Sequence, residues 1–179
     1  YAIHSRNSTK IHKLTKHVVI ASSGQQAERC MLWKVLDQKA REYEFQHHKE
    51  LPAKSVAQVL SNTLYYRRFF PIYTFNVVAG VQDGQGYVFG YDAIGSFECS
   101  PYCVTGSGSA LVTSILDNQI EFKTQQQNKK DLTVEEALDV FKDSFICAGE
   151  RDIYTGDSVE YAVITEEGIT FGRFELRKD

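Results

Sequence analysis

The order of helical and strand patterns is the feature that most constrains the fold of this chain. A buried strand at 17–21 precedes two helical patterns, and three strand patterns between 73 and 105 follow them. Two more helical patterns and a C-terminal hairpin complete the sequence. Two consecutive helices must lie on the same outer side of a sheet, so the second pair needs another face. The order therefore predicts an α+β fold, arranged as a four-layer αββα sandwich with helices outside two stacked sheets.

The helical patterns are set by apolar residues that recur every three or four positions. Pro52 suits a first helical turn, Pro71 ends that helix, and Thr133 with Glu136 forms a capping box. The apolar faces comprise Ala27, Met31, Leu32, Val35, Leu36, Ala40 and Tyr43; Val56, Val59, Leu60, Thr63 and Leu64; Ala110, Leu111 and Ile115; and Val134, Ala137, Leu138, Phe141, Phe145 and Ala148.

The strands are predicted from residues that alternate along the chain. Tyr73 to Ala79 and Tyr87 to Tyr91 alternate on either side of a turn, and Pro101 places the strand at 97–105 at a sheet edge. The last two strands, 159–165 and 169–176, form a hairpin. We expect the polar segment at 123–131 to be an exposed loop.

Composition predicts one globular domain spanning residues 1–179, because 42% of the residues are apolar and only 3 are Pro. A net charge of -3 does not favour a general nucleic-acid or membrane-surface binder. We interpret the 4 cysteines as reduced thiols, and Cys99 and Cys103 lack a second ligand pair at a zinc spacing. No metal or cofactor is predicted.

The segment 149–157 gathers Arg, Asp, hydroxyl and Gly residues between a helix and a strand, where loops carry function. Arg151 and Asp152 fit a buried structural pair better than a catalytic pair, since no nucleophile and base accompany them. Ser107 fits a helix N-terminal hydroxyl better than a nucleophile. Phe69 and Phe70 are either an exposed docking patch or a helix end packed into the core, and the core is favoured.

Several blocks of the sequence closely resemble the beta subunits of the eukaryotic 20S proteasome, nearest to the non-catalytic type-1 group. The resemblance covers essentially the whole chain and rests on six blocks. These are Tyr65–Pro71, Phe75–Gly80, Tyr91–Ser96, Leu116–Gln119, Glu150–Asp157 and Leu176–Asp179.

The resemblance implies an N-terminal nucleophile hydrolase fold, in which active members use an N-terminal Thr whose own amine is the base. By position, Lys10 matches the supporting Lys and Gly24 the Gly of the oxyanion hole. Ser107, Asp152 and Thr155 match the residues that brace the amine. Neither the Thr nor its acidic support has a match. We therefore expect the first strands of the fold upstream of Tyr1, and a vestigial rather than a catalytic framework.

The implied function is a structural beta subunit that has no activity of its own. It would line the chamber for ATP- and ubiquitin-dependent protein degradation, in cytoplasm and nucleus. Its implied partners are beta subunits of the same and the opposite ring and subunits of the alpha ring, with no nucleic acid or membrane. A load of 11 Phe and 10 Tyr also favours subunit contacts. The alternatives are a catalytic subunit whose Thr lies upstream of Tyr1, and a free-standing binding module.

Overall fold

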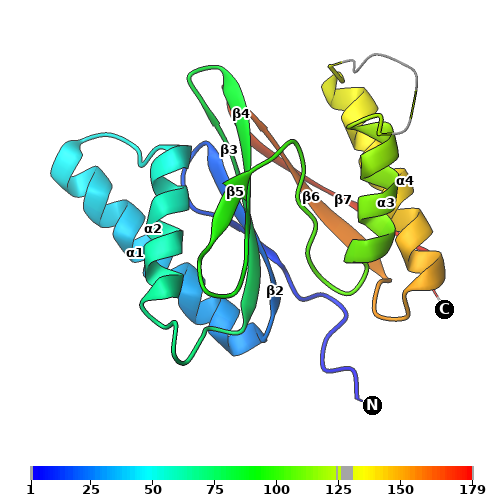
Figure 1. Ribbon diagram of the computed structural model, residues 1–179, viewed down its shortest axis with the longest axis horizontal. Helices are drawn as coiled ribbons and strands as arrows, with labels where there is room; N and C mark the ends of the chain where they lie inside the picture. The colour runs from blue at the N-terminus through cyan, green and yellow to red at the C-terminus, as the bar shows by residue number, and fades with distance from the viewer. Residues whose placement is uncertain (1, 124, 126–130, 179) are drawn as a thin grey trace. The chain divides into compact units, whose positions relative to one another are not determined.

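The computed structural model describes residues 2–123, 125 and 131–178 (Figure 1). The chain forms two compact units, which we name by their content. The sheet unit comprises residues 10–105 and 162–170, and the helical unit comprises 1–9, 106–161 and 171–179. The single domain remains a prediction, and most of the polar loop at 123–131 lies outside the described residues. None of the described helices is both long enough and apolar enough to span a membrane.

The sheet unit is a five-stranded antiparallel sheet in the order β1-β2-β3-β4-β5, with two helices packed on it. Both helices contribute to one apolar cluster with the central strands, which gives the unit a single core. Its elements are β1 (Ile11–Lys13), β2 (Val18–Gly24), α1 (Gln26–His47), α2 (Ala53–Tyr65), β3 (Thr74–Gln82), β4 (Gln85–Tyr91) and β5 (Phe97–Cys99).

The helical unit is built on two helices that pack against each other, α3 (Ser109–Gln119) and α4 (Val134–Arg151). The C-terminal hairpin of β6 (Ser158–Thr165) and β7 (Gly168–Glu175) follows them. The base of this hairpin belongs to the helical unit and its turn to the sheet unit. The predicted capping box of α4 is present, because the Thr133 hydroxyl accepts from Glu136 N and the Glu136 carboxylate accepts from Thr133 N.

The predicted α+β class is confirmed, whereas some of its details were wrong. β1 was not predicted, and the strand expected at 97–105 is only Phe97–Cys99. This strand does lie at the sheet edge, as Pro101 indicated. The buried face of α1 includes Arg29 and Trp33, whereas the predicted members Ala27 and Met31 are exposed.

The end of α2 also differs from the prediction. The helix ends at Tyr65, and the backbone turns through Tyr66–Phe69 before Pro71. Phe69 and Phe70 are 93% and 74% exposed. Their expected packing into the core was therefore wrong, and Leu64 and Ile72 on either side belong to the core instead.

A buried chain of hydrogen bonds joins α1 to the middle of the sheet. The Trp33 indole N–H donates to Ser22 Oγ at 2.9 Å, and the Ser22 hydroxyl donates to Asn76 Oδ1 at 2.7 Å. The Asn76 amide then donates to Thr74 Oγ1 at 3.1 Å. All four side chains are buried, so the polar face of β3 is turned into the core and each donor has a partner there.

Replacing Ser22 by Ala tests this chain. It removes the acceptor of the Trp33 indole and the donor to Asn76, so we expect a loss of about 1–3 kcal/mol in the free energy of unfolding. Denaturant unfolding of the full chain can follow the fluorescence of Trp33, the 1 tryptophan present. Ser23→Ala is the matched control, since that hydroxyl has only long contacts of 3.4 and 3.5 Å. Equal losses in both variants would contradict the assigned role.

Candidate functional site

The turn after α4 brings three of the residues predicted for the site together. The hydroxyls of Ser107 and Thr155 both donate to Asp152 Oδ2, at 2.6 and 2.7 Å. The backbone N–H of Tyr154 donates to the other oxygen, Asp152 Oδ1, at 3.1 Å. The carboxylate is thus held between the start of α3 and the end of α4.

These contacts decide what Asp152 can do chemically. Hydrogen bonds from Ser107 and then Thr155 lower the pKa of the Asp152 carboxyl, despite partial burial that acts to raise it. A carboxylate with a lowered pKa is a weak general base, so it is poorly suited to activate either hydroxyl. The geometry instead fits a structural role, in which Asp152 fixes the hydroxyls of Ser107 and Thr155. We call these three residues the brace.

Two expectations at this corner were wrong. Arg151 is exposed and Asp152 is half-buried, so they do not form a buried pair. Ser107 does not cap α3, whose N-cap is Gly108 with no side-chain hydrogen bond. The hydroxyl turns to Asp152 because a charged acceptor holds it more strongly than a backbone N–H does.

The other two predicted residues, Lys10 and Gly24, belong to the sheet unit. The Lys10 carbonyl accepts from Ser22 N at 2.9 Å, next to the start of β1. Gly24 lies at the corner between β2 and α1 with a φ of 107°, where an added Cβ would run into the Tyr73 carbonyl oxygen. That oxygen accepts from Gln25 N at 2.9 Å, so the corner requires glycine.

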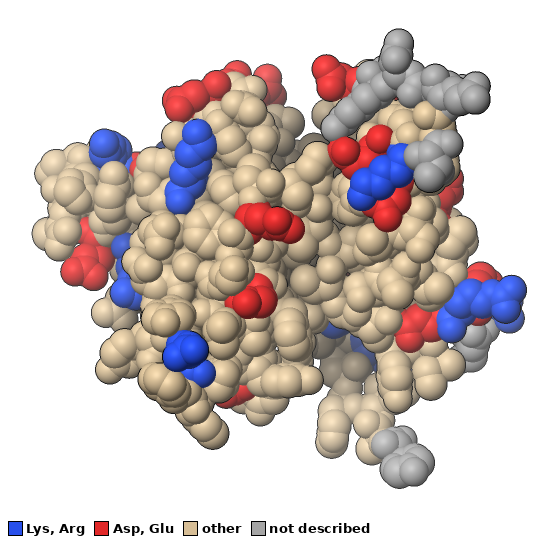
Figure 2. Space-filling view, viewed as in Figure 1, with Lys and Arg blue, Asp and Glu red and all other residues tan. Residues whose placement is uncertain are grey.

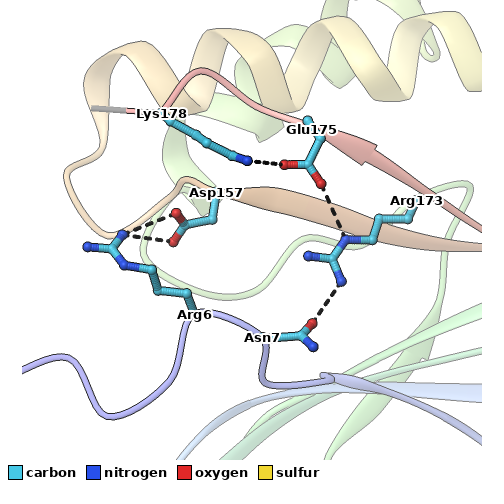
Figure 3. A network of polar contacts seen from close by, with 6 residues as sticks. All are labelled: Arg6, Asn7, Asp157, Arg173, Glu175 and Lys178. Atoms are coloured by element: carbon cyan, nitrogen blue, oxygen red, sulfur yellow. Dashed lines mark hydrogen bonds and ion pairs between the residues drawn. The ribbon is translucent and has the colours of Figure 1, made fainter.

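A polar network that the sequence did not predict lies in the helical unit (Figure 3). Arg6 pairs with both oxygens of Asp157, at 3.1 and 3.3 Å, and Arg173 donates to Asn7 at 2.7 Å. Glu175 accepts from Lys178 at 3.0 Å beside a hollow of about 470 Å³. The Arg6–Asp157 and Arg173–Asn7 contacts join positions far apart in the sequence, so no local spacing could have revealed them. Exposed ion pairs of this kind contribute about 0–1 kcal/mol each.

A second cluster surrounds His17 in the sheet unit, at a hollow of about 290 Å³. Its ring Nδ1 lies 2.9 Å from Glu50 Oε2, and Nε2 lies 3.0 Å from the carbonyl oxygen of Glu166 in the β6–β7 turn. Both ring nitrogens face acceptors, which favours the doubly protonated ring. The hydrogen bond to Glu50 accordingly raises the pKa of His17, although burial opposes it.

Other chemistry-bearing groups are dispersed. All 4 cysteines are free thiols, and burial raises the pKa of Cys103, which makes it a poor nucleophile and ligand. Over residues 2–123, 125 and 131–178, no group of three or more His, Cys, Asp and Glu is arranged to hold a metal ion. On the face drawn in Figure 2, acidic and basic side chains are interspersed.

Comparison with known proteins identifies the family of this chain. A family model described as proteasome subunit matches residues 1–164. Proteasome subunit beta type-1 of Dictyostelium discoideum is 46% identical and covers 100% of this chain and 77% of the relative. The beta type-1 subunit of Arabidopsis thaliana is 45% identical, with 100% and 83% covered. Proteasome subunit beta type-6 of Saccharomyces cerevisiae is 33% identical, with 100% and 79% covered.

The chain belongs to the proteasome subunit family. Its similarity to beta type-1 relatives confirms the resemblance noted from the sequence, and the family confirms a sandwich of the N-terminal nucleophile hydrolase type. The functional roles matched to Lys10, Gly24, Ser107, Asp152 and Thr155 remain predictions. As a proteasome subunit, the chain assembles with other proteasome subunits.

The pKa of Asp152 offers a direct test of the brace. Ser107→Ala removes the strongest hydrogen bond to the carboxylate, so we expect the pKa of Asp152 to rise toward its usual value. NMR titration of the full chain with labelled aspartates measures it. Ser109→Ala is the control, because the side chain of that neighbouring serine makes no hydrogen bond to another described residue. An unchanged pKa in Ser107→Ala would show that the hydroxyl does not hold the carboxylate.

The His17 cluster predicts how stability depends on pH. A raised pKa in the folded state stabilises the fold below the usual His value of about 6.5, and this contribution is lost as pH rises through the folded pKa. The ring is 32% exposed, so the effect is on the order of 1 kcal/mol or less. Trp33 fluorescence during denaturant unfolding at pH 6, 7 and 8 should show the advantage of wild type over His17→Gln shrinking as pH rises.

His4→Gln is the control for this titration, since His4 lies on the exposed N-terminal segment. The Glu50 carboxyl determines how the stability of the fold changes at acidic pH. Its burial acts to raise the pKa, but hydrogen bonds from Thr15 and His17 outweigh this and lower it. The stability that the ionised Glu50 contributes is present above the usual pKa of a Glu carboxyl and is lost as the pH falls through its lowered pKa in the folded state. A wild-type advantage that grows from pH 6 to 8 would contradict the assignment.

Proposed function

We propose that this chain is a structural, non-catalytic beta subunit of the 20S proteasome core particle. The observation that carries the proposal is the similarity to beta type-1 subunits, which covers the whole chain at 46 and 45% identity. The Ser107–Asp152–Thr155 brace, in which both hydroxyls donate to one carboxylate, is compatible with this role. A lowered pKa leaves that carboxylate weakly basic, and each hydroxyl is a donor rather than an activated nucleophile. The brace is the supporting part of a threonine-peptidase centre, and the described residues contain no nucleophile paired with a base beside it.

In this role the chain takes one position in the beta ring. Its partners are beta subunits of its own and the opposite ring, and subunits of the alpha ring. The chain closes part of the chamber wall and positions active neighbours during ATP- and ubiquitin-dependent protein degradation. The particle works in the cytoplasm and nucleus. Membership in the proteasome family supports assembly with other subunits, and the exposed aromatic side chains support extensive contacts.

The alternative is a catalytic beta subunit whose nucleophilic Thr lies upstream of Tyr1. This alternative is favoured by the five residues that match the framework of active family members, because they could support a nucleophilic Thr if one were present. These residues are Lys10, Gly24, Ser107, Asp152 and Thr155. The two functions differ in one chemical property, which is the reactivity of the mature N-terminus toward a reagent that traps activated hydroxyls.

A tagged chain purified from cells that make it can decide between them. We expect it to elute in a particle many times its own mass, and a hydroxyl-directed covalent inhibitor to label other subunits while leaving this chain unlabelled. The labelled catalytic neighbours are the internal control for reagent quality. Labelling of an N-terminal Thr on this chain would establish the catalytic alternative, and elution as a stable monomer would contradict assembly.

A further inference from the structure

The segment between α2 and β3 carries a concentrated set of exposed aromatic side chains. Within nine positions of sequence the exposed fractions are 58% for Tyr65, 90% for Tyr66, 93% for Phe69, 74% for Phe70 and 61% for Tyr73. Single exposed apolar residues need no explanation, but a cluster of this kind marks an interaction surface. We call Tyr65–Phe70 together with Tyr73 the aromatic patch.

The backbone of the aromatic patch is fixed from both ends. Leu64 is fully buried before it and Ile72 is 3% exposed after it. Successive turns are closed by hydrogen bonds of 3.0–3.1 Å, from Tyr66 N to Asn62 O and from Phe70 N to Arg67 O. The Glu28 carboxylate accepts from Tyr73 N at 2.7 Å. A pre-ordered surface loses little conformational entropy on binding, which favours use in an interface.

Two arginines give the aromatic patch its charge. The Arg68 guanidinium lies over the rings of Phe69 and Tyr65, at 5.2 and 5.9 Å, and Arg67 lies 5.7 Å from the Phe70 ring. Within the described part of the chain, neither guanidinium has a carboxylate at ion-pair distance. Stacking on a ring holds each guanidinium in place while leaving its N–H groups to an incoming acceptor.

We infer that the aromatic patch docks a neighbouring proteasome subunit, whose matching surface presents carboxylates beside apolar side chains. The inference rests on the proposed function, because the partner is another subunit of the same particle. Arginine and aromatic residues together are the composition of interface centres. A second copy of this chain fits less well, since a two-fold contact would bring Arg67 and Arg68 against their own symmetry mates.

Charge reversal in the assembled particle tests the partner's chemistry. Arg68→Glu places a carboxylate against the partner's carboxylates, so we expect incorporation of the tagged chain to fall at least about tenfold. Lys54→Glu is the matched control, because Lys54 is also exposed and lies over a ring, 4.6 Å from that of Tyr87, outside the patch. Unchanged Trp33 fluorescence in Arg68→Glu would show that the fold is intact.

Photo-crosslinking identifies the subunit that contacts the aromatic patch. With p-benzoylphenylalanine at Phe69 in the purified particle, we expect crosslinks to an acidic segment of another subunit. The same group at Phe45, which is 83% exposed on α1, is the control and should not crosslink to that segment. Crosslinks to a second copy, to this chain itself or to nothing would overturn the docking proposal.

The outcomes separate the two proposals. If the chain enters the particle and Arg68→Glu behaves like Lys54→Glu, the docking surface is wrong while the proposed function stands. If the wild-type chain enters no particle, the proposed function fails and the docking proposal fails with it.

Discussion

The hydrogen-bonded chain from Trp33 through Ser22 and Asn76 to Thr74 is the constraint on which the sheet unit depends. Its members are buried, so each polar group must find its partner inside the protein. A slip of one residue between β2 and β3 would turn Asn76 outward and leave the Ser22 hydroxyl without its acceptor. The same register places Gly24 against Thr74, where β2 ends and α1 begins.

Local sequence signals predicted most helices and strands, whereas tertiary contacts determine which of their faces are buried. The capping box of Thr133 and Glu136 acts within a few residues, so the sequence displays it. β1 was missed because three residues give too little pattern, and it exists only by pairing with β2. Arg29 lies on the buried face of α1 because its guanidinium rests over the Trp33 ring, at 5.4 Å, which hydrophobic periodicity does not register.

The candidate site was predicted by family resemblance more than by spacing. Ser107 and Asp152 are 45 positions apart, and no helical or strand period joins them. Resemblance matched both residues, but it did not give the direction of the Ser107 hydrogen bond, which the nearby charge of Asp152 decides. The network of Arg6, Asp157 and Arg173 had neither a family match nor a local pattern, so only the folded chain reveals it.

Two features of the structure run against side-chain polarity. Asn76 and Thr74 are polar yet buried, because each completes a hydrogen bond inside the core. Phe69 and Phe70 looked suited to the core but are exposed, and Leu64 and Ile72 on either side are the residues that enter the core. Polarity alone therefore does not decide burial in this chain. A buried polar group is explained by its internal partners, whereas an ordered and exposed aromatic group calls for a partner from outside.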